Sequence, residues 1–251
     1  MLVTGAGGAL GKAVMDEFRR LAMPAIGLTR HPIAAGTDDT AWRVGDLLKP
    51  ETLAPALDGV EVVVHCATKS QHQGEDLAAL NNLLDAGRDL AHLVYVGIAG
   101  IDDAARTFAY YQTKLDCEAR LAAAGVPHTI ARATEFHEFV DVILRSARRG
   151  PIQFLPVMRV QPVETAYVAS RLAAHALAGP QGRAPDIHGP EILTARELFE
   201  QWQEARGSKM LAVQLSGVGR MGLFGRLRAV TGDVGGRTWR AWLKARLAAV
   251  V

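Results

Sequence analysis

The chain has 251 residues, of which 49% are hydrophobic and 22% charged, and its formal net charge is +2. This composition is that of an ordinary globular protein, long enough for one large α/β domain or a domain with a small appendage. No apolar run approaches the roughly 18–20 residues of a membrane span, so no membrane is expected as a partner. The small net charge gives no reason to expect nucleic acid.

The basic charge is concentrated near the end of the chain. From residue 207 to 251, eight basic residues stand against Asp233 alone. This segment forms either a solvated face on terminal helices or a surface for an anionic substrate, a partner or nucleic acid. Cys66 and Cys117 have no metal-ligand spacing and suit a reducing compartment. We expect a cytoplasmic protein without a secretory signal, because the first apolar run already belongs to the fold.

A glycine-rich loop follows the first apolar run, which covers residues 1–4 and predicts a buried strand. After the loop, apolar residues at positions 10, 14, 18 and 21 have helical spacing. Glycines between a strand and a helix let the backbone approach a pyrophosphate, which the free N–H groups of the helix start then bind. The sequence therefore predicts a dinucleotide site whose contacts include Thr4, Gly5, Gly8, Ala9, Leu10 and Gly11.

Further strands are predicted over residues 25–29, 41–45 and 61–66, with helices over 50–57 and 75–89. Arg30 follows the second strand, where a carboxylate would hold the ribose hydroxyls of NAD. A guanidinium pairs with a 2′-phosphate, so NADP(H) is expected in preference to NAD(H), unless Arg30 is merely a solvated arginine. The small residues after the fourth strand suit close approach of the adenine ribose: Cys66, Ala67 and Thr68.

A Y-x-x-x-K pattern opens the helix predicted over residues 110–124, after a fifth strand over 92–96. Tyr110 and Lys114 lie one helical turn apart and share a face. A nearby ammonium group makes a phenol a better proton donor, and the same lysine can hold the ribose hydroxyls of a nicotinamide nucleotide. Tyr110 and Lys114 are therefore the candidate catalytic residues, and Lys114 is also a cofactor contact.

Strands alternate with helices up to a sixth strand over residues 128–132, which predicts a doubly wound parallel sheet of the Rossmann type over residues 1–133. The regular alternation of strands and helices ends there. We expect residues 134–251 to form a small α/β cap on the substrate side that adds late strands to the core. Thr194 opens one helix of this part with a capping box. The elements expected there are helices over 135–148, 164–177, 194–206, 219–230 and 236–247, and strands over 153–155, 159–160 and 184–188.

Several of these segments together resemble the NmrA-like group of atypical short-chain dehydrogenases/reductases. The similarity is carried by residues 4–11, 92–102, 110–121 and 129–137, and it covers residues 1 to about 200 and, more loosely, 235–247. The resemblance implies a Rossmann fold, an NAD(P) site and often reductase activity on quinones, ketones or related apolar molecules. It also implies that Asp46 and Leu47, after the third strand, contact adenine. Some relatives are thought to bind the dinucleotide as sensors, without turnover.

The chain departs from this family at Gly97, where the family carries a serine that helps to polarise a substrate carbonyl. Losing one such donor can cost a factor of ~10²–10³ in rate. We expect Gly97→Ser to raise carbonyl reduction if turnover exists. Another group replaces the missing hydroxyl, or the chemistry does not need it, or the protein is not a conventional reductase. The candidates for replacement are Thr134, Glu135 and His137, since the segment after the sixth strand should reach the nicotinamide side of the cleft. The candidate substrate-pocket residues are Gly97, Ile98, Thr134, Glu135, Phe136 and His137.

His137, Glu138 and Asp141 vaguely resemble a metal-binding helix, but the second histidine of that pattern is absent, so no metal is expected. His137 lines the substrate pocket or is a buried structural histidine. The leading hypothesis is an NADPH-dependent oxidoreductase that reduces a small, largely apolar carbonyl or quinone. The alternatives are a non-catalytic NAD(P)-binding sensor and an epimerase or dehydratase of nucleotide sugars. The expected partner is a small-molecule substrate, and the chain is either a monomer or a homodimer.

Overall fold

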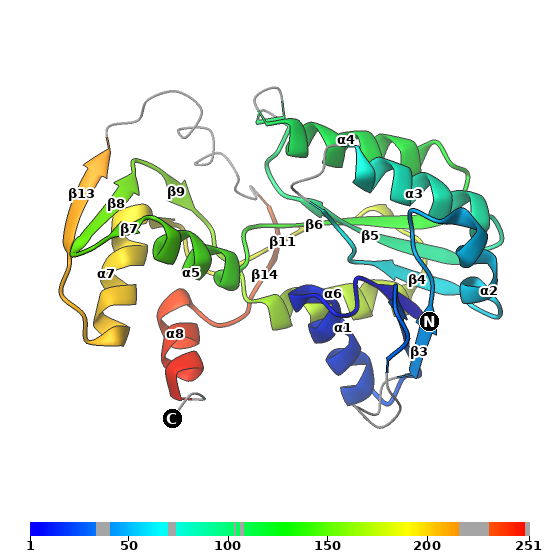
Figure 1. Ribbon diagram of the computed structural model, residues 1–251, viewed down its shortest axis with the longest axis horizontal. Helices are drawn as coiled ribbons and strands as arrows, with labels where there is room; N and C mark the ends of the chain where they lie inside the picture. Colours follow the sequence, from blue (N-terminus) through cyan, green and yellow to red (C-terminus); the bar gives the residue numbers. More distant parts are fainter. Residues whose placement is uncertain (34–40, 70–73, 103, 106–107, 216–230, 249–251) are drawn as a thin grey trace. The chain divides into compact units, whose positions relative to one another are not determined.

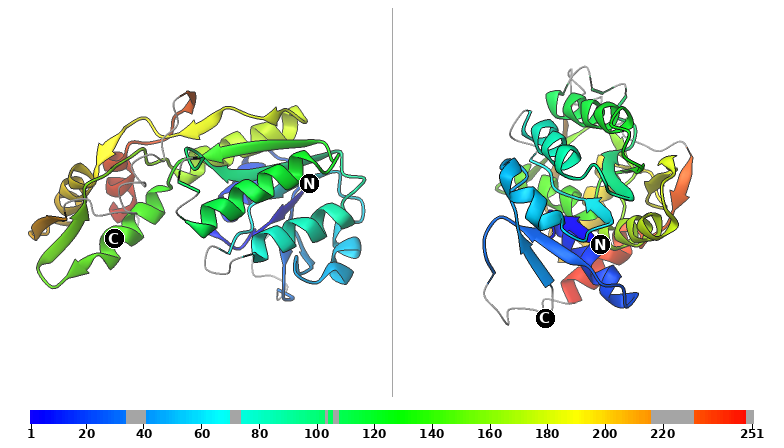
Figure 2. Two further views of the ribbon diagram at one scale, coloured as in Figure 1. Left: turned by 90° about the horizontal axis from the view of Figure 1, so that it is seen from above. Right: turned by 90° about the vertical axis from the view of Figure 1, so that its right-hand side faces the viewer.

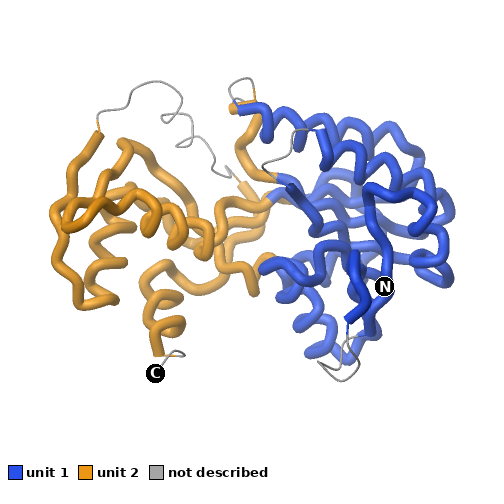
Figure 3. Tube along the Cα trace, viewed as in Figure 1, with its two compact units in different colours: residues 1–97, 108–132, 169–184 blue, residues 98–107, 133–168, 185–251 orange. Residues whose placement is uncertain are grey.

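The computed structural model describes residues 1–33, 41–69, 74–102, 104–105, 108–215 and 231–248. The chain divides into two compact units, shown in Figure 3. The first unit comprises residues 1–97, 108–132 and 169–184, and the second comprises residues 98–107, 133–168 and 185–251.

The first unit is built on a sheet with the strand order β6-β5-β4-β1-β2-β3, and β10 also pairs with β6. The strand β1 pairs in parallel with both β4 and β2, so the strand order reverses at β1. In sheets of this type, ligands bind at the carboxyl ends of the strands beside such a reversal. The strands are β1 (Leu2–Thr4), β2 (Ile26–Thr29), β3 (Ala41–Val44), β4 (Val62–His65), β5 (His92–Ile98), β6 (His128–Ala133) and β10 (Gly182–Arg183).

Helices cover both faces of this sheet. Figure 1 shows α3 and α4 on one face and α1 with α6 on the other, and the right-hand view of Figure 2 shows the same two layers on opposite sides of the strands. Leu80 of α3 and Leu121 of α4 pack in one core with Val63 and Leu93 of the sheet. The doubly wound α/β fold is therefore confirmed. The helices are α1 (Ala9–Arg20), the 3₁₀ turn η1 (Pro50–Thr52), α2 (Leu53–Leu57), α3 (Glu75–Ala86), α4 (Ala109–Ala122) and α6 (Thr165–Ala178).

The described part of the second unit contains short strands and three helices of its own. Its strands pair in three sets: β8 with β13 and β7, β9 with β12, and β11 with β14. Ile187 of β11 also pairs with Ala133, the last residue of β6. Trp239 and Trp242 of α8 pack with Phe199 of α7 and Val140 of α5 in one core. The elements are α5 (His137–Ser146), β7 (Arg148–Arg149), β8 (Ile152–Pro156), β9 (Arg159–Val160), β11 (Asp186–His188), β12 (Leu193–Thr194), α7 (Ala195–Arg206), β13 (Leu211–Leu215), β14 (Gly232–Val234) and α8 (Trp239–Ala248).

The structure corrects one predicted helix and confirms one predicted helix cap. The helix expected over residues 135–148 begins at His137 and ends at Ser146, because Arg148 and Arg149 pair with β8 instead. The capping box of α7 is confirmed: the Glu197 N–H donates to the Thr194 hydroxyl at 3.1 Å, and the Thr194 N–H donates to the Glu197 carboxylate at 2.7 Å. The helix expected over residues 219–230 lies outside the described residues. In the described ranges, no helix is long and apolar enough to cross a bilayer.

Candidate functional site

The glycine loop joins β1 to α1, and two of its glycines are required by close backbone contacts. Gly5 has a φ of +65°, and a Cβ there would lie 2.7 Å from the Ala67 nitrogen. A Cβ on Gly11 would overlap the carbonyl oxygen of Gly5. Gly8 closes the turn by donating its N–H to that same oxygen at 2.9 Å. Gly7 lies outside the three-residue period, and a Cβ there would meet nothing within 4 Å.

The start of α1 fits a phosphate group. Gly8 is the N-cap, and no side chain caps the first turn. The N–H groups of a first turn need acceptors, and an anion is the acceptor that the helix dipole favours. Gly8 and Ala9 are exposed, whereas Leu10 is buried in the core. The loop therefore has the shape and the free donors that a dinucleotide pyrophosphate requires.

Thr4 supports the loop from behind. Its side chain is fully buried, and its hydroxyl accepts the Ala67 N–H at 3.2 Å and lies 2.9 Å from His65 Nδ1. Burial, with a smaller effect of the Lys114 charge, lowers the pKa of His65 to about 4, so this ring is neutral at neutral pH. The hydroxyl of Thr4 thus ties β1 to β4 and holds the two carboxyl ends of these strands together.

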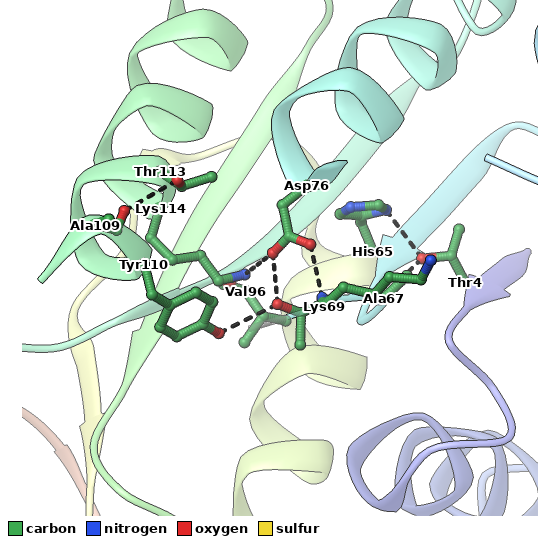
Figure 4. A network of polar contacts seen from close by, with 11 residues as sticks. Thr4, His65, Ala67, Lys69, Asp76, Val96, Ala109, Tyr110, Thr113 and Lys114 are labelled. Atoms are coloured by element: carbon green, nitrogen blue, oxygen red, sulfur yellow. Dashed lines mark hydrogen bonds and ion pairs between the residues drawn. The ribbon is translucent and has the colours of Figure 1, made fainter. Parts of the chain in front are cut away.

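The lysine of the Y-x-x-x-K pattern is buried beside the carboxyl end of β5. Lys114 is only 5% exposed, and its Nζ lies 3.8 Å from Asp76 Oδ2 and 3.4 Å from the carbonyl oxygen of Val96. The same ammonium group lies 5.0 Å from the ring centroid of Tyr95 and 6.0 Å from that of Tyr110. A buried ammonium needs such partners, and these contacts fix its position (Figure 4).

The structure brings Tyr110 together with Thr68 and Asp76, and Figure 4 shows Tyr110 and Asp76 in the same network. The Tyr110 hydroxyl lies 3.2 Å from Thr68 Oγ1, which donates to Asp76 Oδ2 at 2.5 Å. Sequence reasoning assigned Thr68 to the adenine ribose and did not single out Asp76. An acidic residue in the first turn of a helix is so common that its position alone gave no signal.

The remaining candidate cofactor contacts lie at the ends of neighbouring strands. Arg30 is exposed after β2. Asp46 Oδ1 accepts the Leu48 N–H at 3.0 Å within the turn after β3, and the carbonyl oxygen of Leu47 accepts from Asn82 Nδ2 of α3 at 2.8 Å. Burial raises the pKa of the Cys66 thiol to about 12, which leaves it without nucleophilic character at neutral pH.

Gly97 lies against a buried ion pair. A Cβ on Gly97 would overlap Glu118 Oε1 and lie 2.9 Å from Arg132 Cγ. The Arg132 guanidinium donates to both oxygens of Glu118 at 2.7–3.0 Å, and both side chains are buried. No room exists for a serine without moving this pair. These contacts argue against the expectation that Gly97→Ser raises carbonyl reduction, which only an activity measurement tests.

The other pocket candidates belong to the second unit. Thr134 is buried, and its hydroxyl has no hydrogen-bond partner among the described residues. Neither carboxylate oxygen of Glu135 has a hydrogen bond of normal geometry there. Burial raises the pKa of Glu135 to about 8, and the nearby backbone N–H groups of Glu135 and Gln161 oppose this by less. Phe136 and Ile98 are half-buried.

His137 is a packing residue of the second unit. Its side chain is fully buried, its Nε2 lies 3.2 Å from the carbonyl oxygen of Pro162, and its ring lies 5.5 Å from Trp239 and 5.4 Å from Trp242. Burial lowers the pKa of His137 to about 4, so the ring is neutral. The described residues contain no group of three His, Cys, Asp or Glu side chains able to hold a metal ion.

Comparison with known proteins agrees with this geometry. A family model described as NAD(P)H-binding matches residues 5–141, more than half of the chain. A (4-alkanoyl-5-oxo-2,5-dihydrofuran-3-yl)methyl phosphate reductase of Streptomyces griseus is 28% identical over 219 residues, which cover 82% of this chain and 74% of the reductase.

Two solved structures share the fold. An NADPH-dependent quinone oxidoreductase from Escherichia coli, complexed with NADPH, has a TM-score of 0.79 and 17% identity and covers 98% of this chain and 99% of its own. The Citrobacter sp. triphenylmethane reductase, complexed with NADP(H), has a TM-score of 0.72 and 24% identity over 86% of this chain and 79% of its own. The chain belongs to the NAD(P)H-binding family, and its motifs resemble those of the NmrA-like atypical short-chain dehydrogenases/reductases.

Proposed function

We propose that the protein is an NADPH-dependent oxidoreductase that reduces a small, largely apolar carbonyl or quinone. The observation that carries this proposal is the network in which Lys114, Asp76, Thr68 and Tyr110 meet, in the same unit as the uncapped glycine loop. The names of the relatives support reductase chemistry, since the two solved structures are of quinone and dye reductases.

The roles follow from the chemistry of each group. A bound nicotinamide cofactor supplies the hydride. The glycine loop would bind its pyrophosphate, Lys114 would hold its ribose hydroxyls, and Tyr110 would donate a proton to the substrate oxygen. Thr134 and Glu135 stay candidates for substrate contact, because the Thr134 hydroxyl and both Glu135 carboxylate oxygens are buried without a hydrogen bond of normal geometry among the described residues.

We further propose that residues 1–133 bind the cofactor and residues 134–251 the substrate, and that the protein works in the cytoplasm. Both cysteines are free thiols, which suits a reducing compartment. A non-catalytic sensor is the second candidate function. The buried Glu118–Arg132 pair favours it, because this pair excludes the hydroxyl that family reductases carry at Gly97.

Turnover separates the two functions. The protein mixed with NADPH and a panel of quinones and aldehydes is expected to consume NADPH, as followed by its absorbance. Tyr110→Phe should lower the rate by about a hundredfold, because it removes the proton donor and keeps the ring. Tight NADPH binding with no consumption across the panel would assign the protein to the sensors instead.

Arg30 carries the proposed preference for NADPH. Arg30→Ala removes the guanidinium that would pair with the 2′-phosphate, so we expect the Kd for NADPH to rise about 10- to 100-fold. The Kd for NADH should stay unchanged, because NADH has no such phosphate. Isothermal calorimetry with both nucleotides measures the two values. Equal affinity of the unchanged protein for NADH and NADPH would contradict the preference.

A further inference from the structure

Asp76 is a buried carboxylate whose two oxygens are used by three different donors. Its side chain is 8% exposed. Oδ1 accepts the Lys69 N–H at 2.7 Å, while Oδ2 accepts the Thr68 hydroxyl at 2.5 Å and lies 3.8 Å from Lys114 Nζ. Burying a charge is costly unless it is paired and hydrogen-bonded, and these partners meet that requirement.

The direction of the hydrogen bonds is fixed by counting protons. Thr68 has a single hydroxyl proton, which it donates to Asp76, because a carboxylate only accepts. The hydrogen bond between Thr68 and Tyr110 must then have the Tyr110 hydroxyl as donor. A directed chain therefore runs from Tyr110 through Thr68 to Asp76, while Lys114 reaches the same carboxylate oxygen from the other side (Figure 4).

A helix-capping role does not account for Asp76. It is the second residue of α3, where a carboxylate commonly bonds the free N–H groups of the first turn. The cap of α3 has no side-chain hydrogen bond, and the oxygens of Asp76 go to Lys69, Thr68 and Lys114. The carboxylate is thus directed at the Y-x-x-x-K pair.

We propose that Asp76 is the positioning residue for both members of this pair, acting on Lys114 directly and on Tyr110 through Thr68. The inference rests on the proposed function, in which Lys114 holds the cofactor and Tyr110 donates the proton. It predicts two effects that can be measured separately. Loss of Thr68 affects mainly the tyrosine, whereas loss of the Asp76 charge affects the tyrosine and the lysine together.

The Thr68 hydroxyl also supplies a hydrogen-bond donor beside Tyr110, which Gly97 cannot supply because it has no side chain. When Tyr110 turns its proton from Thr68 to a substrate oxygen and protonates it, its O–H bond breaks, the O–H bond of the product alcohol forms, and a phenolate remains until solvent returns a proton. The hydroxyl of Thr68 lies 3.2 Å away and can turn its proton from Asp76 to that phenolate. A hydrogen bond to a charged acceptor is the stronger kind, and Gly97 has no side chain to supply one.

The two effects are tested with Thr68→Val, which keeps the shape of the side chain and removes its hydroxyl, and with Asp76→Asn. Thr68→Val should lower turnover about 10- to 100-fold and weaken NADPH binding less than Asp76→Asn does. Asp76→Asn should lower turnover and also weaken NADPH binding, as measured by calorimetry. Thr68→Ser should keep the turnover of the unchanged protein, because serine keeps the hydroxyl that valine lacks.

Thr113→Val is the matched control. Thr113 precedes Lys114, and its hydroxyl donates to the Ala109 carbonyl oxygen of its own helix at 3.0 Å, without a contact to the pair. This variant should keep both turnover and NADPH affinity. Two outcomes would overturn the proposal that Asp76 acts on Tyr110 through Thr68 and on Lys114 directly. Thr68→Val would weaken NADPH binding as much as turnover, or Thr113→Val would have the same effect as Thr68→Val.

A measurement without substrate distinguishes this inference from the proposed function. In a double-mutant cycle of Thr68→Val and Tyr110→Phe, thermal unfolding of the apoprotein should show coupling, the double variant losing less than the sum of the single ones. Coupling in a protein that binds NADPH without consuming it would leave the positioning intact and refute the reductase. Strict additivity would overturn the link between Thr68 and Tyr110 whatever the turnover.

Discussion

Replacing Gly97 by serine is expected to lower the free energy of unfolding by about 3 kcal/mol, because the new Cβ would displace one half of a buried ion pair. The tip of a glutamate can usually swing aside at little cost. Here both oxygens of Glu118 accept from Arg132, and both side chains are buried, so any movement leaves a charge without its partner. Carbonyl reduction should not rise.

Urea unfolding measures the effect of Gly97→Ser, as a lower midpoint at an unchanged slope. Gly7→Ser is the control for adding a hydroxymethyl group, because a Cβ on Gly7 would meet nothing within 4 Å. In a background where both Glu118 and Arg132 are alanine, the serine should cost much less, since the obstacle is gone. Wild-type stability of the single variant would refute the steric account.

Glu135→Gln is expected to change how stability depends on pH, by about 5 kcal/mol over the titration range. Burial raises the pKa of Glu135 from 4.5 to about 8, so the folded protein holds a proton that the unfolded chain releases. The stability from this group is fully present below about pH 4.5 and is lost as pH rises toward about pH 8. Glutamine does not titrate and removes this loss.

The measured quantity is the difference in unfolding free energy between the variant and the unchanged protein at about pH 5 and at about pH 8. Glu135→Gln should be the more stable of the two at the higher pH, with the difference shrinking as pH falls. His65 and His137 titrate alike in both proteins and cancel in the difference. Glu51→Gln, at an exposed position, controls for the loss of one negative charge. A difference that does not vary with pH would contradict the raised pKa.

The parts of the site that the sequence predicts are those whose requirements are local. Gly5 and Gly11 are needed because of backbone contacts within a few residues and with the next strand, so their spacing alone indicates the loop. Tyr110 and Lys114 share a helix face one turn apart, which any α-helix guarantees. The α/β alternation likewise predicts the sheet of the first unit, because each strand and each helix carries its own hydrophobic period.

The parts that the sequence does not predict depend on residues far apart in the chain. Asp76 meets Lys114 across 38 positions, and nothing near either residue indicates the contact. The sequence shows that a glycine stands at position 97 where the family has a serine. It does not show that a Cβ at this position would point at Glu118 and Arg132. The strand β13 was missed because its partner β8 lies about 60 residues earlier and supplies the hydrogen bonds that define it.

The aromatic side chains are sorted by unit. Of the four tryptophans, Trp202, Trp239 and Trp242 lie buried in the second unit, whereas of the four tyrosines, Tyr95, Tyr110 and Tyr111 belong to the first. Indole emission therefore reports mainly on one part of the chain and phenol absorbance mainly on the other. The protein carries two built-in optical labels, which allow the melting of each part to be followed without any added dye.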